Sequence, residues 1–195
     1  MVRRTRAEME ATRATLLATA RRFFAERGYA DTSMDELTAH AGLTRGALYH
    51  HFGDKQGLLA AVVAEIDAET DARLLAAYAS APDPWEGFRR RCRAYLEMAL
   101  EPEMQRIVLR DAKAVLGGAS PDAHRHCLAS MASLIANLMA EGIMAHADPQ
   151  ALASLIYGSV AEAAFWIAEG EDGGARLAQS VAALDLLLRG TRVAP

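Results

Sequence analysis

The stretch Thr32–Leu59, TSMDELTAHAGLTRGALYHHFGDKQGLL, contains two short helical patterns with a sharp turn between them. Gly42 stands at that turn, where the first helix ends and the backbone needs a residue that adopts positive φ at little cost. The apolar residues are spaced as in helices, not as in strands. They are Met34, Leu37 and Ala41 before the turn, and Leu43, Ala47 and Leu48 after it. The stretch therefore predicts a helix-turn-helix.

The second helix of such a unit lies in the major groove of DNA, with its N-terminal residues at the base edges and the flanking chain on phosphates. From Thr44 to His51, the side chains not needed for packing are hydroxyl, guanidinium, phenol and imidazole groups, and none is acidic. All of them can donate a hydrogen bond to a phosphate or to a base edge. Gly46 and Ala47 are small, so the backbone can approach DNA closely.

Residues on either side extend this candidate surface. Thr32 or Ser33 is expected to cap the first helix and can also offer a hydroxyl to a phosphate. Asp54 is a plausible cap for the next helix, whereas the dipole of that helix disfavours Lys55 in its first turn. A DNA phosphate would compensate for this. The predicted DNA-contacting residues are Thr32, Ser33, Thr44, Arg45, Gly46, Tyr49, His50, His51 and Lys55.

The run from Ala41 to Phe52, AGLTRGALYHHF, followed by Lys55 and Leu58, resembles the DNA-binding domain of TetR-family transcriptional repressors. It matches the pattern of that family at nearly every specified position, over about a quarter of the chain. Thr38 is one departure, because the family more often has alanine there. We expect a small adjustment of packing at this position and no change of fold.

The resemblance also implies roles for individual residues. Tyr49, His51 and Lys55 match family positions that hold phosphates. Arg45 is the first candidate for contact with a guanine, because a guanidinium can donate twice, to its O6 and N7 atoms. The residues expected to meet base edges are Thr44, Arg45 and His50.

Length and composition limit the fold class. The chain has 195 residues and is 52% hydrophobic, which is enough to bury a sizeable core in one or two domains. Strand-forming residues are sparse, so the sequence predicts an all-α protein. It has neither a run of about 18 uncharged apolar residues nor a signal-peptide pattern at the N-terminus. We therefore expect a cytoplasmic protein.

The charge is distributed unevenly. The whole chain has a net charge of −4, which at first argues against a nucleic-acid partner. Residues 1–55, however, carry nine basic and seven acidic residues, a net of +2, and residues 56–195 carry a net of −6. This division predicts a DNA-binding domain over residues 1–55 and a second helical domain over residues 56–195.

The chain begins with a basic segment, MVRRTR, at residues 1–6. Such an arm can add phosphate contacts or reach a neighbouring minor groove, but a solvated tail without a partner is an equally good interpretation. A helix is expected from about Arg6 to Arg27, with Gly28 ending it. Its expected buried stripe is Leu16, Leu17, Ala20, Phe23 and Phe24.

Several residue types that often carry chemistry are interpreted as structural. Cys92 and Cys127 stand alone in apolar helical patterns, which favours buried small hydrophobic residues over a redox sensor. His124 and His126 are two residues apart, so on a helix they point in different directions and do not favour a metal site. No metal, cofactor or enzymatic motif is expected, because the sequence lacks nucleophile-elbow, zinc-protease and phosphate-loop patterns.

The second domain is expected to bind a small hydrophobic or amphipathic effector of unknown identity, as the resemblance implies. Arginines 89–91 and 93 are expected opposite the apolar face of their helix and could bind an anion or nucleic acid, although a solvated face paired with nearby acids is the simpler interpretation. For each large side chain in this domain, a place in the core is an alternative to a place in the pocket. The candidate pocket residues are Trp85, Phe88, Tyr95, Met98, Met104, Met131, Leu134, Tyr157, Phe165 and Trp166.

The last two predicted helices are more apolar than a surface hairpin needs, which favours an interface. The resemblance implies that they pair with their copies as a four-helix bundle in a homodimer. Two-fold symmetry would place the two recognition helices about 34–36 Å apart on a near-palindromic operator. Closure of the subunit's own core is the alternative. The candidate interface residues are Leu155, Gly158, Ser159, Glu162, Leu177, Val181, Leu184 and Leu188.

These expectations combine into a dimeric, sequence-specific DNA-binding regulator. The resemblance implies a repressor that a ligand releases from its operator, because the ligand has different affinities for two conformations. A ligand-independent regulator, or an activator, with the same fold is the alternative. An enclosed cavity near Trp85 to Met104 would favour the ligand-released form, and a solid second domain would favour the alternative.

Overall fold

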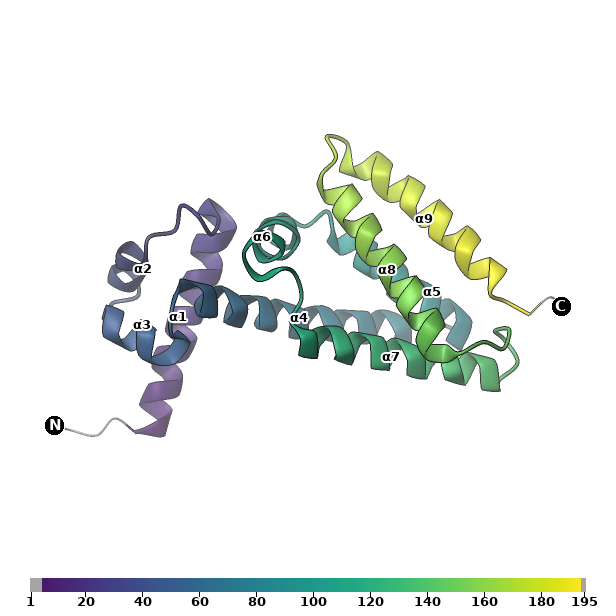
Figure 1. Cartoon of the computed structure of the whole chain (residues 1–195), viewed down its shortest axis with the longest axis horizontal. Helices are drawn as coiled ribbons and strands as arrows, with labels where there is room; N and C mark the ends of the chain where they lie inside the picture. The colour runs from purple at the N-terminus through teal and green to yellow at the C-terminus, as the bar shows by residue number, and fades with distance from the viewer. Residues whose placement is uncertain (1–4, 194–195) are drawn as a thin grey trace. The chain divides into compact units, whose positions relative to one another are not determined.

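The computed structural model describes residues 5–193, and all of their regular secondary structure is helical (Figure 1). One isolated bridge between Met144 and Arg192 is the exception to helix, and it forms no strand among these residues. The predicted all-α class is therefore confirmed. The chain divides into two compact units.

The first unit comprises the residues up to Ile66 together with Arg106–Ala119. It contains the helix-turn-helix and the start of the long helix α4. Most of a π-helix, η1, also belongs to it. Its elements are α1 (Arg6–Arg27), α2 (Met34–His40), α3 (Arg45–Phe52), the beginning of α4 (Lys55–Ala79), most of η1 (Met104–Ala112) and α6 (Lys113–Leu116).

Helix α1 spans the predicted residues and is capped at both ends. Thr5 accepts a hydrogen bond from the backbone N–H of Glu8, whose carboxylate accepts one from the N–H of Thr5, so the two form a capping box. Gly28 ends the helix at φ 84° and ψ 169°, a conformation that is essentially restricted to glycine. The buried face carries Leu16, Leu17, Ala20, Phe23 and Phe24, the five residues predicted for it.

Helices α2 and α3 form the predicted helix-turn-helix. Ser33 caps α2 and Thr44 caps α3, each accepting a hydrogen bond from a backbone N–H in the first turn. Gly42 between them has a φ of 65°. Thr38 is buried and its hydroxyl donates to the carbonyl oxygen of Met34 at 2.9 Å, so the extra polar group is satisfied inside the helix.

The segment Arg106–Ala119 packs in the first unit, although it is distant from α1 in the sequence. Arg106 Nη2 donates to the carbonyl oxygen of Arg27 at 2.6 Å, and the backbone N–H of Tyr29 donates to Asp111 Oδ2 at 2.7 Å. These two bonds hold the end of α1 and the residue after Gly28. The sequence showed a helical pattern here, but not the wider π-helical turns.

The second unit comprises Asp67–Gln105 and the residues from Ser120 onward. Helix α8 packs against α7 and α9, and α5 packs against α7, α8 and α9. Each of these four helices begins with a side-chain cap, from Ser120 or an aspartate, and three of them have proline in the first turn. Their bounds are α5 (Pro84–Met98), α7 (Pro121–Ala140), α8 (Pro149–Ala168) and α9 (Gly173–Gly190).

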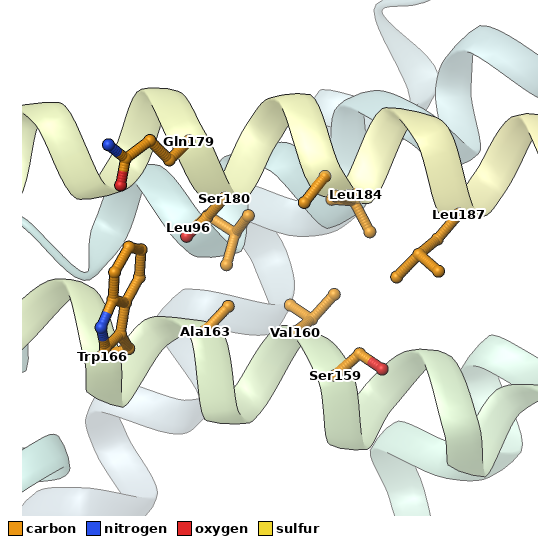
Figure 2. A pocket seen from close by; sticks show the side chains of 10 residues that line it. Leu96, Ser159, Val160, Ala163, Trp166, Gln179, Ser180, Leu184 and Leu187 are labelled. Atoms are coloured by element: carbon orange, nitrogen blue, oxygen red, sulfur yellow. The ribbon is translucent and has the colours of Figure 1, made fainter.

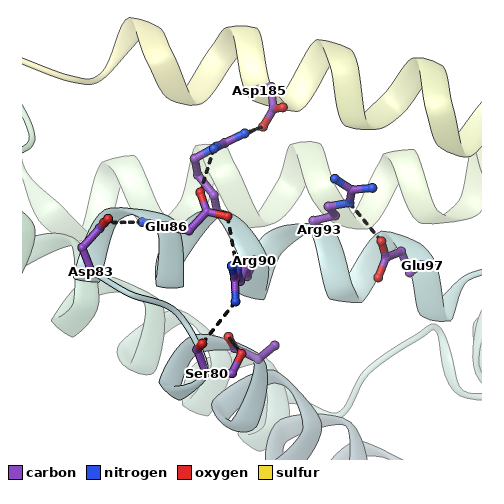
Figure 3. Close-up of polar contacts among 9 residues, drawn as sticks. Ser80, Asp83, Glu86, Arg90, Arg93, Glu97 and Asp185 are labelled. Carbon is purple, nitrogen blue, oxygen red and sulfur yellow. Dashed lines mark hydrogen bonds and ion pairs between the residues drawn. The ribbon is translucent and has the colours of Figure 1, made fainter.

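The arginine cluster of α5 is mostly paired with acids, as the simpler interpretation predicted (Figure 3). Arg89 bonds to Asp185 at 2.8 Å, and Arg93 bonds to Glu97 at 2.9 Å. Arg91 does not share this exposed face, because it lies one turn after Phe88 on the buried side and is only 4% exposed. The expectation that all four arginines lie opposite the apolar face is therefore wrong for Arg91.

Helix α8 has an unusual composition. Within residues 5–193 it is the one helix long and apolar enough to cross a membrane, and only 28% of that window is buried in the single chain. This is weak evidence for a membrane span, because an apolar helix that packs in a core or an interface passes the same test. The exposed apolar part of α8 needs a covering surface of some kind.

Gly28 generates a prediction about stability. Replacing it with alanine should lower the free energy of unfolding by about 1–3 kcal/mol, because a Cβ is strained at this φ and ψ and would also overlap the Arg106 guanidinium. Thermal or urea unfolding would measure the loss. Gly46→Ala is the control, since Gly46 is helical with ordinary surroundings and alanine should add about 0.5–1 kcal/mol there. Equal stability of Gly28→Ala and the wild type would show that a Cβ is tolerated at this position, which would contradict the prediction.

Candidate nucleic-acid interface

Helix α3 packs against α1 and α2 with one side and exposes the other side to solvent. Among the described residues, Leu48 is the one buried residue of α3, with no solvent exposure. Thr44, Arg45 and His50 are exposed, and Tyr49 is 43% exposed. The first helical turn and the hydrogen-bonding side chains therefore face solvent together, as a groove-binding helix requires.

Arg45 lies at the start of α3 and is contacted on two sides. Its Nη1 atom lies 3.1 Å from Oδ1 and 3.2 Å from Oδ2 of Asp35 on α2. Its Nη2 atom donates to the hydroxyl oxygen of Tyr49 at 3.1 Å. The hydrogen bond that Arg45 donates to Tyr49 and the nearby Asp35 carboxylate raise the pKa of Arg45, which is charged at any physiological pH.

The remaining aromatic donors follow Arg45 on the same helix. The Tyr49 hydroxyl accepts from Arg45 and keeps its own proton for a second acceptor. The rings of His50 and His51 are 5.4 Å apart in an edge-to-face arrangement. His50 is exposed and His51 is half-buried. Both can donate to an anion from this position.

Lys55 has partners that the sequence did not reveal. Its Nζ atom donates to the carbonyl oxygen of Ala30 at 3.2 Å and lies 4.5 Å from the centre of the Tyr29 ring. Burial against these groups lowers the pKa of Lys55. The carbonyl, the aromatic ring and the negative charges of Asp31 and Asp111 thus offset the unfavourable helix dipole in the free chain, a role that the sequence assigned to a phosphate. Asp54 is the cap of α4, accepting from Gly57 N at 2.7 Å.

The two hydroxyl residues before α2 are not equivalent. Thr32 is only 2% exposed, and its hydroxyl donates to the carbonyl oxygen of Gly28 at 2.7 Å. Ser33 is exposed and accepts from Glu36 N as the cap of α2. The side chain of Thr32 therefore closes the turn after α1, whereas Ser33 presents its hydroxyl outward.

Most of the predicted basic arm lies outside the described residues, which begin at Thr5. Thr5 is the cap of α1, and Arg6 is its first residue.

The candidate effector-binding residues of the second unit fall into two groups. Those that are fully or nearly fully buried form part of its core: they are Trp85, Phe88, Met98, Met104 and Met131. Those that keep some exposure are Tyr95, Leu134, Tyr157, Phe165 and, at 42% exposed, Trp166.

A group of polar side chains lies beside Tyr95 and Tyr157, and the sequence alone did not predict it. Asp67 and Asp71, one helical turn apart on α4, interact electrostatically with the hydroxyl of Tyr157. Burial, together with the charge of Asp71, raises the pKa of Asp67 from 3.8 to about 6. The only signal in the sequence was the spacing of two acids on one helix face, which normally indicates a solvated surface.

The two thiols are protonated at neutral pH. Burial raises the pKa of Cys92 to about 12 and that of Cys127 to about 11, with Asp71 and Asp67 adding to the effect on Cys127. Cys92 is buried, as interpreted from the sequence, whereas Cys127 is half-buried and its Sγ donates to Asp71 Oδ1 at 3.9 Å. Raised thiol pKa values favour structural roles over a redox sensor. His124 and His126 have different neighbours, as their spacing predicted. The His124 ring is 5.0 Å from the Tyr157 ring, and His126 Nε2 is 3.8 Å from Asp71 Oδ2.

Helices α8 and α9 run side by side and form an apolar groove of about 400 Å³ (Figure 2). Trp166 stands at one end of it and Leu187 at the other. The residues that line it are Leu96, Ser159, Val160, Ala163, Trp166, Gln179, Ser180, Ala183, Leu184 and Leu187.

Exposure separates the candidate interface residues. Leu184 and Leu188 are 6% and 1% exposed, so they close the core of the chain itself. Leu177 and Val181 are half-buried, whereas Gly158, Ser159 and Glu162 are exposed. The most exposed apolar residues of the two helices are Leu155, Trp166, Leu186 and Leu187.

Leu186 and Leu187 were missed because α9 carries two apolar stripes. Leu177, Val181, Leu184 and Leu188 form one row at a spacing of three or four residues. Spacing alone does not show which of two such rows faces the core.

Two family profiles match the chain. One, for bacterial regulatory proteins of the tetR family, matches residues 16–62, and the other, for a tetracyclin repressor-like C-terminal domain, matches residues 85–191. The chain is 78% identical in sequence to a TetR-family transcriptional regulator from Pectobacterium atrosepticum, of which a crystal structure is known. The match covers 98% of this chain and 100% of that one, with a TM-score of 0.93.

Two further relatives match a shorter part of the chain. The HTH-type transcriptional repressor BepR of Brucella suis is 33% identical over 108 residues, which are 55% of this chain and 52% of the relative. The HTH-type transcriptional regulator AcrR of Shigella flexneri is 33% identical over 116 residues, 56% of this chain and 51% of the relative. The chain thus spans about half the length of these relatives.

Asp67 generates a prediction about pH. Its pKa is raised in the folded chain, so the unfolded state loses the proton first and the free energy of unfolding falls as the pH rises from about 4 to about 6. Asp67→Asn should remove this loss and be more stable than the wild type by about 1–2 kcal/mol at pH 7.5, after allowance for solvent screening. Urea unfolding at several pH values measures it. A difference that stays constant down to pH 4 would indicate a packing effect and contradict the account.

Proposed function

The chain belongs to the TetR family of bacterial transcriptional regulators, and from this membership we propose that it represses transcription by binding a near-palindromic operator as a homodimer. A small hydrophobic or amphipathic molecule releases the repressor. The protein acts in the cytoplasm and has no catalytic activity. Its DNA-binding domain is residues 1–55, and residues 56–195 bind the effector and form the dimer.

One observation carries the DNA-binding part of this proposal. Helix α3 buries Leu48 and exposes the hydrogen-bonding side chains of Arg45, Tyr49 and His50. A helix with this division packs on its own domain by one side and enters the major groove by the other. The names of the relatives, which describe HTH-type repressors and regulators, support the same function.

The geometry supports a division of roles among these donors. Tyr49, His51 and Lys55 hold phosphates, as the matching positions of the family do, and the exposed Ser33 before α2 adds a hydroxyl. Lys55 exchanges the Ala30 carbonyl for a phosphate when DNA binds, because a phosphate charge attracts the ammonium more strongly than that single neutral acceptor. Thr44, Arg45 and His50 read base edges, and Gly46 allows the close approach of the backbone. Thr32 contributes by fixing the turn that presents Ser33.

The dimer forms through α8 and α9. The exposed Leu155, Trp166, Leu186 and Leu187 make these helices an apolar surface that water does not solvate well. A second copy that packs on this surface would bury these residues and the groove beside them, as in an isologous two-fold interface. Gly158 and Ser159 are exposed and small, so a partner helix can approach α8 closely there.

The effector site lies in the second domain. Tyr95 and Tyr157 keep partial exposure, and the carboxyls of Asp67 and Asp71 lie close enough to affect the Tyr157 hydroxyl. An amphipathic molecule matches this combination, because its apolar part suits the aromatic rings and its polar part can hydrogen-bond to the hydroxyl or carboxyl groups. Leu134 and Phe165 also keep some exposure and are further members of the proposed pocket. The buried Trp85, Phe88, Met98, Met104 and Met131 form the core of the same domain, and Trp166 belongs to the groove between α8 and α9.

Two variants test the DNA-binding face. Arg45→Ala should cost about 1–3 kcal/mol on the operator and relax the preference at one base pair per half-site. Lys55→Ala should weaken binding to all sequences alike and make the salt dependence shallower, because it removes a phosphate contact. Fluorescence anisotropy on operator and mixed-sequence duplexes at several salt concentrations measures both effects. Equal losses for Arg45→Ala on the two duplexes would rule out its role in base reading.

A charged substitution tests the dimer. Leu187→Glu should convert the dimer to a monomer, because Leu187 is 58% exposed in the single chain and the proposed interface would bury it. Leu75→Glu is the control, since Leu75 on α4 is similarly exposed, at 55%, and lies outside the proposed interface. Sedimentation equilibrium at micromolar concentration measures the mass. A dimeric Leu187→Glu, or a monomeric Leu75→Glu, would contradict the assigned interface.

A further inference from the structure

Asp35 is an acidic residue beside the helix that faces DNA. Its carboxylate contacts Arg45 Nη1 with both oxygens, at 3.1 and 3.2 Å, and both side chains are more than half exposed. An acid in this position repels phosphates, so it weakens non-specific attraction to DNA. Its presence beside the first residue of α3 therefore needs an explanation.

Stability does not explain the pair. Exposed ion pairs contribute little to folding, because solvent screens them and ordering two long side chains has an entropic cost. An acid in the first turn of α2 interacts favourably with the helix dipole, but Glu36 supplies the same charge in the same turn. Glu36 pairs with Arg27, at 2.6 Å. Both acids thus interact favourably with the dipole of α2. They differ in their partners, because Asp35 pairs with Arg45 and Glu36 pairs with Arg27.

The contacts of Arg45 restrict its orientation without using all its donors. One Nη atom faces Asp35, the other donates to the Tyr49 hydroxyl, and the guanidinium carbon is 5.7 Å from the centre of the Tyr49 ring. A guanidinium has five N–H donors in a rigid fork. Three remain for DNA, which is enough for a guanine that accepts two.

We propose that Asp35 is a positioning residue for base reading, which holds Arg45 in one orientation on α3 and reduces binding to DNA that offers only phosphates. This inference rests on the proposed function. In the free protein, Asp35 and Tyr49 orient the guanidinium, so that Arg45 meets its base without first being ordered by DNA. At a non-matching sequence, the Asp35 charge remains close to phosphates and base acceptors that it repels, so discrimination increases.

The test is a selection of binding sites from a pool of duplexes with a 24-base-pair random core, using the full chain. The wild type, Asp35→Asn, Glu36→Gln and Arg45→Ala are compared. The double variant Asp35→Asn/Arg45→Ala completes a double-mutant cycle on the selected wild-type site. Melting temperatures show that each variant is folded, and Asp35→Ser is a second variant at the same position.

We expect Asp35→Asn to lose the base preference that Arg45→Ala loses, by about tenfold at the same base pair. Its affinity for a mixed-sequence duplex should not fall, because the substitution removes a negative charge. Glu36→Gln should keep the full preference. The double variant should discriminate no worse than Arg45→Ala alone, since Asp35 acts through Arg45.

The inference would be overturned by a full preference retained by Asp35→Asn, or by additive losses in the double variant. A Glu36→Gln variant that loses the preference equally would also do so, because a general charge effect would then explain both. These outcomes differ from a failure of the proposed function, in which the wild type itself would enrich no sequence.

Discussion

Helix α3 depends on its packing against the rest of the first unit. It has eight residues, and a helix of that length does not persist alone in water. The burial of Leu48 together with Leu37 and the two phenylalanines of α1 supplies what the short helix lacks. Because one side is committed to that core, the polar side chains of the other side all face outward. The proposed function follows from this division.

Much of the first unit could be predicted from the sequence. The span of α1, its five buried residues and the turn at Gly42 follow from spacing and from glycine's tolerance of positive φ. Partners distant in the sequence could not be predicted. Asp111 holds the backbone of Tyr29 across 82 positions, and Lys55 rests on Ala30 and Tyr29, because the chain brings these groups together only after it folds.

The second unit was less predictable for a physical reason. Its helices carry apolar residues on more than one side, so spacing alone cannot separate a stripe that faces the core from one that faces a partner. Leu184 and Leu186 are two residues apart on α9, yet the first is buried and the second is exposed. Arg91 was also hard to place from the sequence. Its charge suggested a surface position, but it lies between Phe88 and Tyr95 on the buried side of α5.

The central claim is that the exposed face of α3 binds a specific DNA sequence. The most direct test measures the fluorescence anisotropy of the purified chain on tiled duplexes from the DNA that flanks its own gene, with Tyr49→Ala as the control and salt varied. The account predicts tight, steeply salt-dependent binding to one near-palindromic duplex, which Tyr49→Ala loses. Tight binding that Tyr49→Ala retains in full would contradict it, because DNA would then be held by another surface.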